Sequence, residues 1–156
     1  MSSPMNDSKK PLSKTAQTIQ ETATQMFAEK GYDGTIMDEL AMLTGANKAS
    51  IYYHFGNKEN LYAICLHNLF KTVADAVIEA VEHTEGIEKQ LSTFISTFAQ
   101  QSSAHRQMPA VLMREIASGG VHMPVIARQQ MQRLLECFKS LLKQGQEANI
   151  FRLVDP

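Results

Sequence analysis

The chain has 156 residues, of which 44% are hydrophobic and 20% charged, and its formal net charge at pH 7 is −1. This length allows one or two small domains with a buried core. The weak charge argues against a protein that holds nucleic acid by general electrostatic attraction alone, and residues 1–70 carry six Lys and Arg against seven Asp and Glu. No apolar run approaches the length of a membrane span and the N-terminus resembles no signal peptide, so we expect no membrane partner and a cytoplasmic protein.

Residues 1–13 are polar with two prolines and predict a disordered tail. Lys9, Lys10 and Lys14 could contact DNA phosphates, although a solvated tail is the simpler interpretation. Ser13 is expected to cap a helix that runs to Lys30 and is closed by Gly31. The apolar residues expected on one face of this helix are Ala16, Ile19, Ala23, Met26 and Phe27.

Residues 35–61 predict two short helices joined by a glycine turn, followed by the start of a third. Thr35 and Asp38 fit a capping box before a helix over residues 36–44. Gly45 suits a sharp turn, because glycine tolerates a positive φ. Asn47 and Asn57 are good N-caps for the next two helices, over residues 48–54 and from residue 58. In the helix over residues 36–44, the positions expected to be buried are Ile36 or Met37, Leu40 and Leu43.

The helix over residues 48–54 has one apolar side and one mixed side. At about 100° per residue, Ile51 and Phe55 share an apolar seam, while Ala49 and Tyr53 lie opposite. The outward side offers small, hydroxyl, aromatic and cationic groups, which suit phosphates, thymine methyls and base edges. A Tyr-Tyr-His-Phe run alone would fit core packing equally well. The agreement of caps, turn and register instead favours a helix-turn-helix that enters the major groove of DNA.

Residues 14–62 resemble the N-terminal domain of the TetR (AcrR-like) family of transcriptional regulators, most specifically in the run KASIYYHFGNKENL from Lys48 to Leu61. The resemblance implies phosphate or base contacts from Thr35, Lys48, Ala49, Ser50, Tyr52, Tyr53, His54 and Lys58. Family members often carry Arg near the start of the domain's second helix. Here that corner reads Met37-Asp38-Glu39, which is acidic, and we expect it to repel DNA.

The rest of the chain also reads as helix, so the predicted fold class is all-α. A three-helix helix-turn-helix domain (residues 14–60) is joined by a long helix, residues 58 to about 81, to a helical domain over residues 61–156. Residues 87–98 and 131–142 carry further amphipathic patterns, and Pro109 and Pro124 suit helix starts. The resemblance implies that this second domain binds an effector and forms a homodimer. The family's dimer helices usually lie beyond the position of Pro156, so we expect either that C-terminal helices are missing from this chain or that its dimer surface is built differently.

An effector pocket is predicted from Met and Phe side chains, which form deformable apolar cavities. Its expected lining residues are Phe94, Phe98, Met108, Val111, Leu112, Met113, Ile116, Met123, Met131 and Phe138. The alternative is that these side chains only form the core of the bundle. Arg114, Glu115 and His122 are the polar groups best able to orient a ligand, or else they are ordinary surface or ion-paired residues.

Catalysis has little support in the sequence. The five histidines are scattered, and in Cys65-x-His67 the two side chains point to different sides of a helix, so we expect no enzyme, metal or cofactor. Cys65 and Cys137 are expected to be buried thiols. The leading interpretation is a repressor that binds a palindromic operator as a homodimer and is released by a small hydrophobic effector. The alternative is a helical ligand-binding or protein-interaction module without operator recognition.

Overall fold

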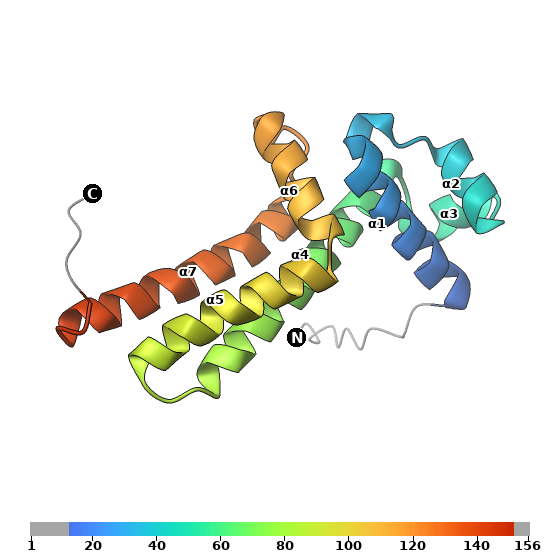
Figure 1. Ribbon diagram of the computed structural model, residues 1–156. Coiled ribbons are helices and arrows are strands. Elements are labelled where there is room, and N and C mark those ends of the chain that lie inside the picture. Colours follow the sequence, from blue (N-terminus) through green and yellow to red (C-terminus); the bar gives the residue numbers. More distant parts are fainter. Residues whose placement is uncertain (1–12, 152–156) are drawn as a thin grey trace, which may run out of the picture.

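The computed structural model describes residues 13–151, and all regular structure within this range is helical. The helices are α1 (Lys14–Gly34), α2 (Met37–Thr44), α3 (Lys48–Phe55), α4 (Lys58–Glu82), α5 (Ile87–Ala104), α6 (Gln107–Ala117) and α7 (Val125–Glu147). Figure 1 shows α1–α3 gathered at one end of an elongated molecule, with α4, α5 and α7 extending from it. The all-α prediction is confirmed. The predicted tail over residues 1–12 and the chain end over residues 152–156 lie outside the described residues.

The first helix begins and bends where the sequence predicts. The Ser13 hydroxyl accepts a hydrogen bond from the Ala16 amide at 3.2 Å, as an N-cap should. Regular helix ends at Gly31, whose φ of 75° is open to glycine at little cost, and the chain makes one more turn to Gly34. The apolar face predicted for this helix is buried, in full, at Ala16, Ile19, Ala23, Met26 and Phe27.

The helix-turn-helix also forms through the predicted local signals. Gly45 ends α2 in the left-handed conformation at φ 66°. Asn47 accepts a hydrogen bond from the Ser50 amide at 2.7 Å, and Asn57 accepts one from the Asn60 amide at the same distance. These side chains therefore satisfy otherwise free amides at the starts of α3 and α4.

The start of α2 differs from the prediction, and the capping box at Thr35 is wrong. The Thr35 side chain is only 1% exposed, and its hydroxyl donates to the Gly31 carbonyl at 2.8 Å instead of capping α2. Ile36 occupies the N-cap position without a side-chain hydrogen bond. Leu43 is 59% exposed rather than buried. The side chain of Met37 faces the core, and each further step of three residues along a helix turns the side chain by about 60° away from that direction. Leu43, two such steps after Met37, therefore points toward solvent.

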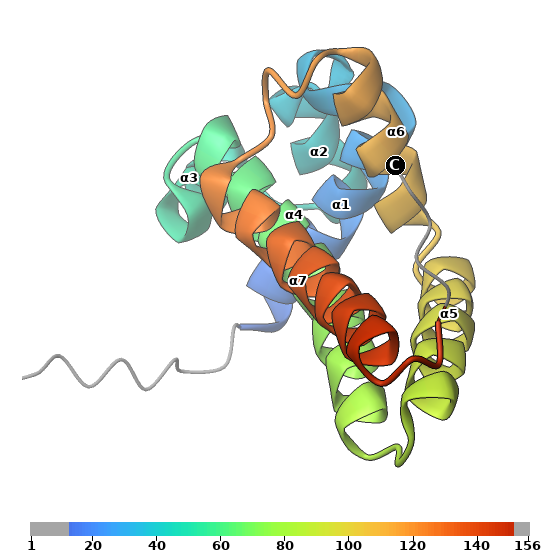
Figure 2. The same ribbon diagram turned by 90° about the vertical axis from the view of Figure 1, so that its left-hand side faces the viewer.

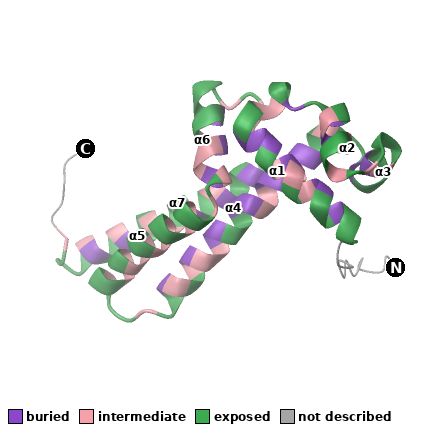
Figure 3. Cartoon of the chain, turned by 45° about the vertical axis from the view of Figure 1, so that its right-hand side comes forward, coloured by how far each residue is buried: buried purple, intermediate pink, exposed green. Residues whose placement is uncertain are grey.

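Helix α4 is the centre of the molecule and contacts α1, α3, α5, α6 and α7. Figure 3 shows the buried residues concentrated on α1 and α4. Leu61, Leu66, Phe70, Val73 and Val77 are completely or almost completely buried in this core. By length and composition α4 could cross a membrane, which the sequence reading missed, but half of its most apolar stretch is buried inside the protein. Packing inside the protein thus uses about half of this apolar stretch.

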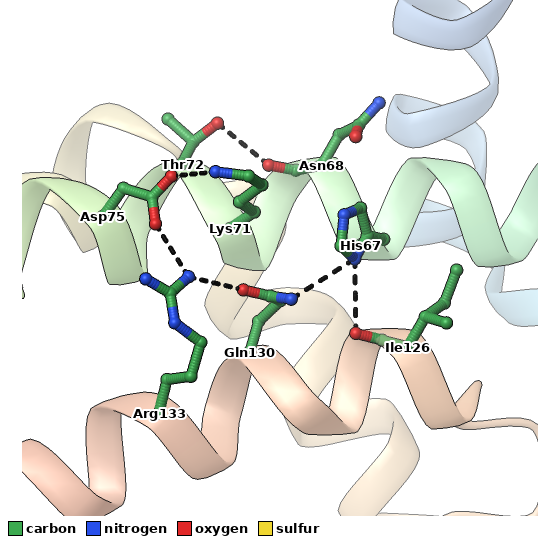
Figure 4. A network of polar contacts seen from close by, with 8 residues as sticks. All are labelled: His67, Asn68, Lys71, Thr72, Asp75, Ile126, Gln130 and Arg133. Carbon is green, nitrogen blue, oxygen red and sulfur yellow. Dashed lines mark hydrogen bonds and ion pairs between the residues drawn. The ribbon is translucent and has the colours of Figure 1, made fainter. Parts of the chain in front are cut away.

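Helices α4 and α7 are joined by a polar network as well as by apolar packing (Figure 4). Arg133 on α7 donates to Asp75 on α4 at 2.7 Å and to Gln130 at 2.8 Å. Lys71 pairs with the other Asp75 oxygen. His67 Nδ1 lies 3.3 Å from the Ile126 carbonyl, to which it donates when it carries the ring proton. These contacts add polar links to the apolar packing between the two helices.

Helix α5 is the least covered of the larger helices. It lies beside α4 and α7 (Figure 2), yet none of its residues is fully buried. Phe94 and Phe98 pack against the core from its inner side, whereas Ile95, which the sequence pattern includes among the apolar face, is more than half exposed. The predicted helix start near Pro124 is confirmed, since Pro124 is the N-cap residue of α7, while α6 starts two residues before Pro109.

Candidate nucleic-acid interface

Helix α3 presents one packed side and one open side. Ile51 and Phe55 are buried against the neighbouring helices, as their spacing predicts. Tyr53 is 86% exposed, which is far more than core packing would allow. Its ring lies edge-on to the His54 ring, with 5.3 Å between the two ring centroids. The exposed or partly exposed residues on α3 are Lys48, Ala49, Ser50, Tyr52, Tyr53 and His54. The structure therefore brings six of the eight predicted contact residues together on one helix.

The seventh predicted contact, Lys58, is the first residue of α4 and is partly exposed. Its ammonium lies 4.6 Å from the centroid of the Tyr32 ring, which is a cation–π arrangement. Burial, followed by the negative charges of Glu59 and Asp33, raises the pKa of Tyr32, so its ring stays neutral beside the lysine. The free amides at the start of α4 add positive potential at the same place, which suits a phosphate.

Thr35, the eighth predicted contact, does not fit this surface. Its side chain is buried and its hydroxyl is already donated to the Gly31 carbonyl. A buried hydroxyl with a satisfied donor offers nothing to a phosphate. The structure thus gives this contact no support, because residue 35 serves the junction between α1 and α2.

The acidic corner of α2 is less repulsive than the sequence predicts. Asp38 Oδ1 lies 2.5 Å from Lys48 Nζ, and Glu39 Oε1 lies 2.5 Å from Lys30 Nζ. The hydrogen bond that Lys48 donates to Asp38 raises the pKa of Lys48. Each carboxylate is therefore matched by a cation, and the first of these pairs lies at the start of α3. Sequence reasoning could not find either pair, since the partners are nine and ten residues apart in separate helices.

An apolar cavity of about 230 Å³, which is shallow and broadly open to solvent, lies between α5 and α7. Its lining residues are Phe94, Phe98, Met131, Leu134, Leu135 and Phe138. Four of these were predicted to line an effector pocket, and the two leucines were missed, although they share the same helical face of α7 as Met131 and Phe138. The ring of Phe138 lies 5.2 Å from that of Phe94 and closes one side.

The remaining predicted pocket residues lie outside this cavity. Met108 and Val111 are buried in the main core, and Met123 packs against it. Met113 and Ile116 are mostly exposed on α6, and Leu112 beside them is partly buried. The prediction of one pocket from both α6 and α7 is therefore wrong, because α6 packs against α1 rather than across the cavity.

The polar residues considered as ligand contacts instead join α6 and the segment after it to the helix-turn-helix domain. Arg114 on α6 donates to the Ala28 carbonyl at 2.9 Å and also to that of Glu29. The Tyr62 hydroxyl on α4 donates to Glu115 on α6, with both side chains buried. His122 Nε2 lies 3.2 Å from Asp33, and its ring stacks on Tyr32 at 4.5 Å. They fix α6 and the segment after it against the helix-turn-helix domain.

The two cysteines differ in environment. Cys65 is buried in the core, and burial raises its pKa to about 12. Cys137 is only partly buried on α7, so the prediction of two buried thiols is half right. Among residues 13–151, no three His, Cys, Asp or Glu side chains are grouped as metal ligands.

A short helix that packs through two apolar residues, exposes a polar and aromatic face, and follows a glycine turn defines the class of helix-turn-helix DNA-binding domains. Residues 19–64 match the model of the bacterial regulatory proteins of the tetR family. These residues cover α1 from Ile19, α2, α3 and the start of α4. The match therefore falls on the part of the chain that carries the interface.

Two relatives match the same part of the chain. The negative transcriptional regulator IcaR of the biofilm operon icaADBC from Staphylococcus epidermidis is 40% identical over 60 residues, which are 38% of this chain and 32% of that protein. IcaR from Staphylococcus aureus is 48% identical over 44 residues, covering 28% of this chain and 24% of that protein. The chain thus matches about a third or less of the length of these relatives.

Solved structures extend the likeness to the whole fold. The TetR family transcriptional regulator PfmR from Thermus thermophilus has a TM-score of 0.67 at 26% identity, over 88% of this chain and 75% of that one. The fatty acid degradation regulator FadR from Bacillus halodurans has a TM-score of 0.73 at 20% identity, over 91% and 73% of the two chains, which shows a shared fold. Residues 19–64 thus match the tetR family of bacterial regulatory proteins, and the fold of the described residues is similar to that of TetR family transcriptional regulators.

Proposed function

We propose that this chain represses transcription by binding a specific DNA sequence through α3. The observation that carries the proposal is the exposure of Tyr53 on a helix otherwise anchored by two buried side chains. Exposed apolar surface surrounded by polar residues is typical of an interaction site. Tyr53 and its neighbours Ala49 and Ser50 suit the base edges and thymine methyls of the major groove.

Phosphate contacts would then fix α3 in the groove. Lys58 and the amides at the start of α4 favour one phosphate, and Tyr52 and His54 supply hydrogen-bond donors beside the helix. The chain's weak net charge means that such placed contacts must supply the affinity, rather than a general basic surface. Repression, rather than activation, is proposed because the IcaR relatives are named as negative regulators.

A homodimer on a palindromic operator is part of the proposal. Two copies of α3 would lie about 34–36 Å apart, in successive major grooves on one side of the DNA. About a quarter of each of these solved relatives lies outside the part that this chain matches.

The cavity between α5 and α7 is proposed to hold a small hydrophobic effector. Its lining is almost wholly apolar, so it offers no hydrogen bond that would select a polar ligand. Both lining helices pack on α4, which begins beside the DNA-binding surface. An effector that binds better to one position of α4 would shift the population toward it and so change DNA affinity.

Selection of sequences from a random DNA pool tests operator binding, followed by competition assays on the winning sequence. Tyr53→Ala should weaken binding to that sequence by about 1–3 kcal/mol, with an unchanged midpoint of thermal unfolding. Ile95→Ala, which removes an exposed apolar side chain from α5, is the matched control and should change neither. Equal affinity of the Tyr53→Ala variant and the parent chain would remove Tyr53 from the interface. Failure to enrich any sequence would favour a ligand-binding or interaction module instead.

The effector proposal needs a separate measurement. The uncharged fluorescent probe N-phenyl-1-naphthylamine should bind the parent chain and be lost when Phe98→Arg places a charge in the cavity. Lys139→Ala, on the exposed side of α7, should leave probe binding unchanged. Equal probe binding by Phe98→Arg would place the ligand elsewhere.

A further inference from the structure

The ion pair between Asp38 and Lys48 joins α2 to the first residue of α3. The two charged atoms are 2.5 Å apart, yet the side chains remain 72% and 47% exposed. This pair therefore lies in the open, at the end of the helix whose first residues reach base edges when a helix-turn-helix docks on DNA. An exposed ion pair contributes little to folding stability, so its stabilising effect does not explain its position.

The chemistry of a carboxylate limits what Asp38 could contact on DNA. Phosphates repel it, and guanine and thymine offer only acceptor atoms or a methyl group in the major groove. The donors available there are the amino groups of cytosine and adenine, and Asp or Glu pairs characteristically with cytosine N4. A carboxylate at this place therefore acts on specificity rather than on general affinity.

Lys48 supplies hydrogen-bond donors next to the carboxylate of Asp38. One of its three ammonium protons points to Asp38, which leaves two donors for acceptors on DNA. Guanine presents O6 and N7 side by side, and lysine is a common partner for them. A carboxylate acceptor next to an ammonium donor thus mirrors the edge of a C·G base pair, where a cytosine donor lies beside guanine acceptors.

We propose that Asp38 and Lys48 act together as a reader of one C·G base pair in the operator, with Asp38 on cytosine N4 and Lys48 on guanine. The proposal rests on the proposed function, because it requires α3 to lie in the major groove. The proposal assigns a role to the acidic residues at the start of α2. From the sequence alone, these residues are expected to repel DNA. The proposal also makes the intramolecular ion pair a device that orients both side chains before DNA arrives.

The test is selection from a random DNA pool with the parent chain, Asp38→Ala, Asp38→Asn and the control Glu39→Gln. Glu39 is the adjacent acid, paired with Lys30, so its variant removes one negative charge without touching the proposed reader. Asp38→Ala should abolish the preference for C·G at one position, with discrimination falling by about tenfold or more. Asp38→Asn should move that preference toward A·T, since an amide pairs with adenine N6 and N7.

The outcomes separate this inference from the proposed function. If the parent chain enriches a motif and Asp38→Ala enriches the same motif with equal discrimination, the reader is overturned while operator binding stands. A common rise in affinity for every sequence, equal in Asp38→Asn and Glu39→Gln, would likewise show a charge effect alone. If the parent chain enriches no motif, the proposed function and the reader both fail. Far-ultraviolet circular dichroism on each variant shows that the comparison is between folded proteins.

Discussion

Removal of one oxygen atom, in Tyr62→Phe, tests the link between the helix-turn-helix domain and α6. In the structure the Tyr62 hydroxyl donates to Glu115 Oε1, and the other carboxylate oxygen, which is also buried, has no hydrogen-bond partner among the described residues. The Phe variant keeps the ring contacts, whose centroids lie 4.7 Å from Phe27 and 5.1 Å from Tyr32. The change therefore isolates the hydrogen bond from the packing.

The expected loss of stability arises because Tyr62→Phe leaves the buried Glu115 side chain without its hydrogen-bond donor. A hydrogen bond to a charged group is worth about 1.5–3 kcal/mol, and a buried acceptor without a partner loses its solvation as well. We expect Tyr62→Phe to lower the free energy of unfolding by about 2 kcal/mol, which corresponds to roughly 4–8 °C in the melting midpoint of a chain of this size. Burial, followed by the bond to Glu115, raises the pKa of Tyr62, so the hydroxyl keeps its proton throughout the neutral range.

Urea unfolding followed by circular dichroism at 222 nm measures this loss, since the chain has no tryptophan. Tyr53→Phe removes the same atom from an exposed ring and should stay within about 0.5 kcal/mol of the parent chain. The double variant Tyr62→Phe with Glu115→Met should recover much of the loss, because two apolar groups leave no unsatisfied acceptor. A Tyr62→Phe variant as stable as Tyr53→Phe would refute the reasoning.

Three further predictions concern the turn, the thiols and the pH dependence. Gly45→Ala should cost about 1 kcal/mol in urea unfolding, because φ is 66° while no atom lies within 4 Å of the added Cβ; Gly45→Val should cost more, and equal stability of all three would argue against the left-handed turn. Iodoacetamide at pH 8 should modify Cys137 faster than Cys65, whose pKa burial raises to about 12, and mass spectrometry of peptides decides the order; faster reaction at Cys65 would contradict its burial. The hydrogen bond from Lys71, followed by that from Arg133, holds the pKa of Asp75 below its ordinary 3.8 against the opposing effect of burial, so its contribution is present above that pH and lost as the pH falls through the lower folded-state value. The stability gap between the parent chain and Asp75→Asn should therefore be constant near neutrality, below about 1 kcal/mol because the side chain is 38% exposed, and should shrink below about pH 4; a gap that widens there would contradict the assigned direction of the pKa shift.

Features that depend on neighbours along the chain were predictable from sequence. Ser13, Asn47 and Asn57 each bond an amide three residues ahead, so a local pattern contains the whole interaction. The glycine turn at Gly45 and the apolar seam of α3 are local in the same sense. The resemblance of residues 14–62 to the TetR family also depends on one continuous run, and the family match over residues 19–64 confirms it.

The predictions that differ from the structure concern features that depend on packing between helices. Thr35 reads as a cap from its type and spacing, but the junction of α1 and α2 encloses it and offers the Gly31 carbonyl to its hydroxyl. The effector pocket was predicted from apolar residues, mainly Met and Phe, between residues 94 and 138, whereas Met108 on α6 is buried in the main core. Composition identifies apolar residues, but it does not say which helices face each other.

Local sequence was enough to predict most of the helices, the three asparagine and serine caps and the kind of domain at the N-terminus, because hydrogen bonds and side-chain periodicity within a few residues carry that information. The contacts of Asp38 with Lys48, and of Tyr62 with Glu115, 53 residues further along, follow instead from the packing of separate helices. Such pairs arise when packing of apolar faces brings separate helices together, and the charged and polar groups then take the partners that this packing leaves within reach.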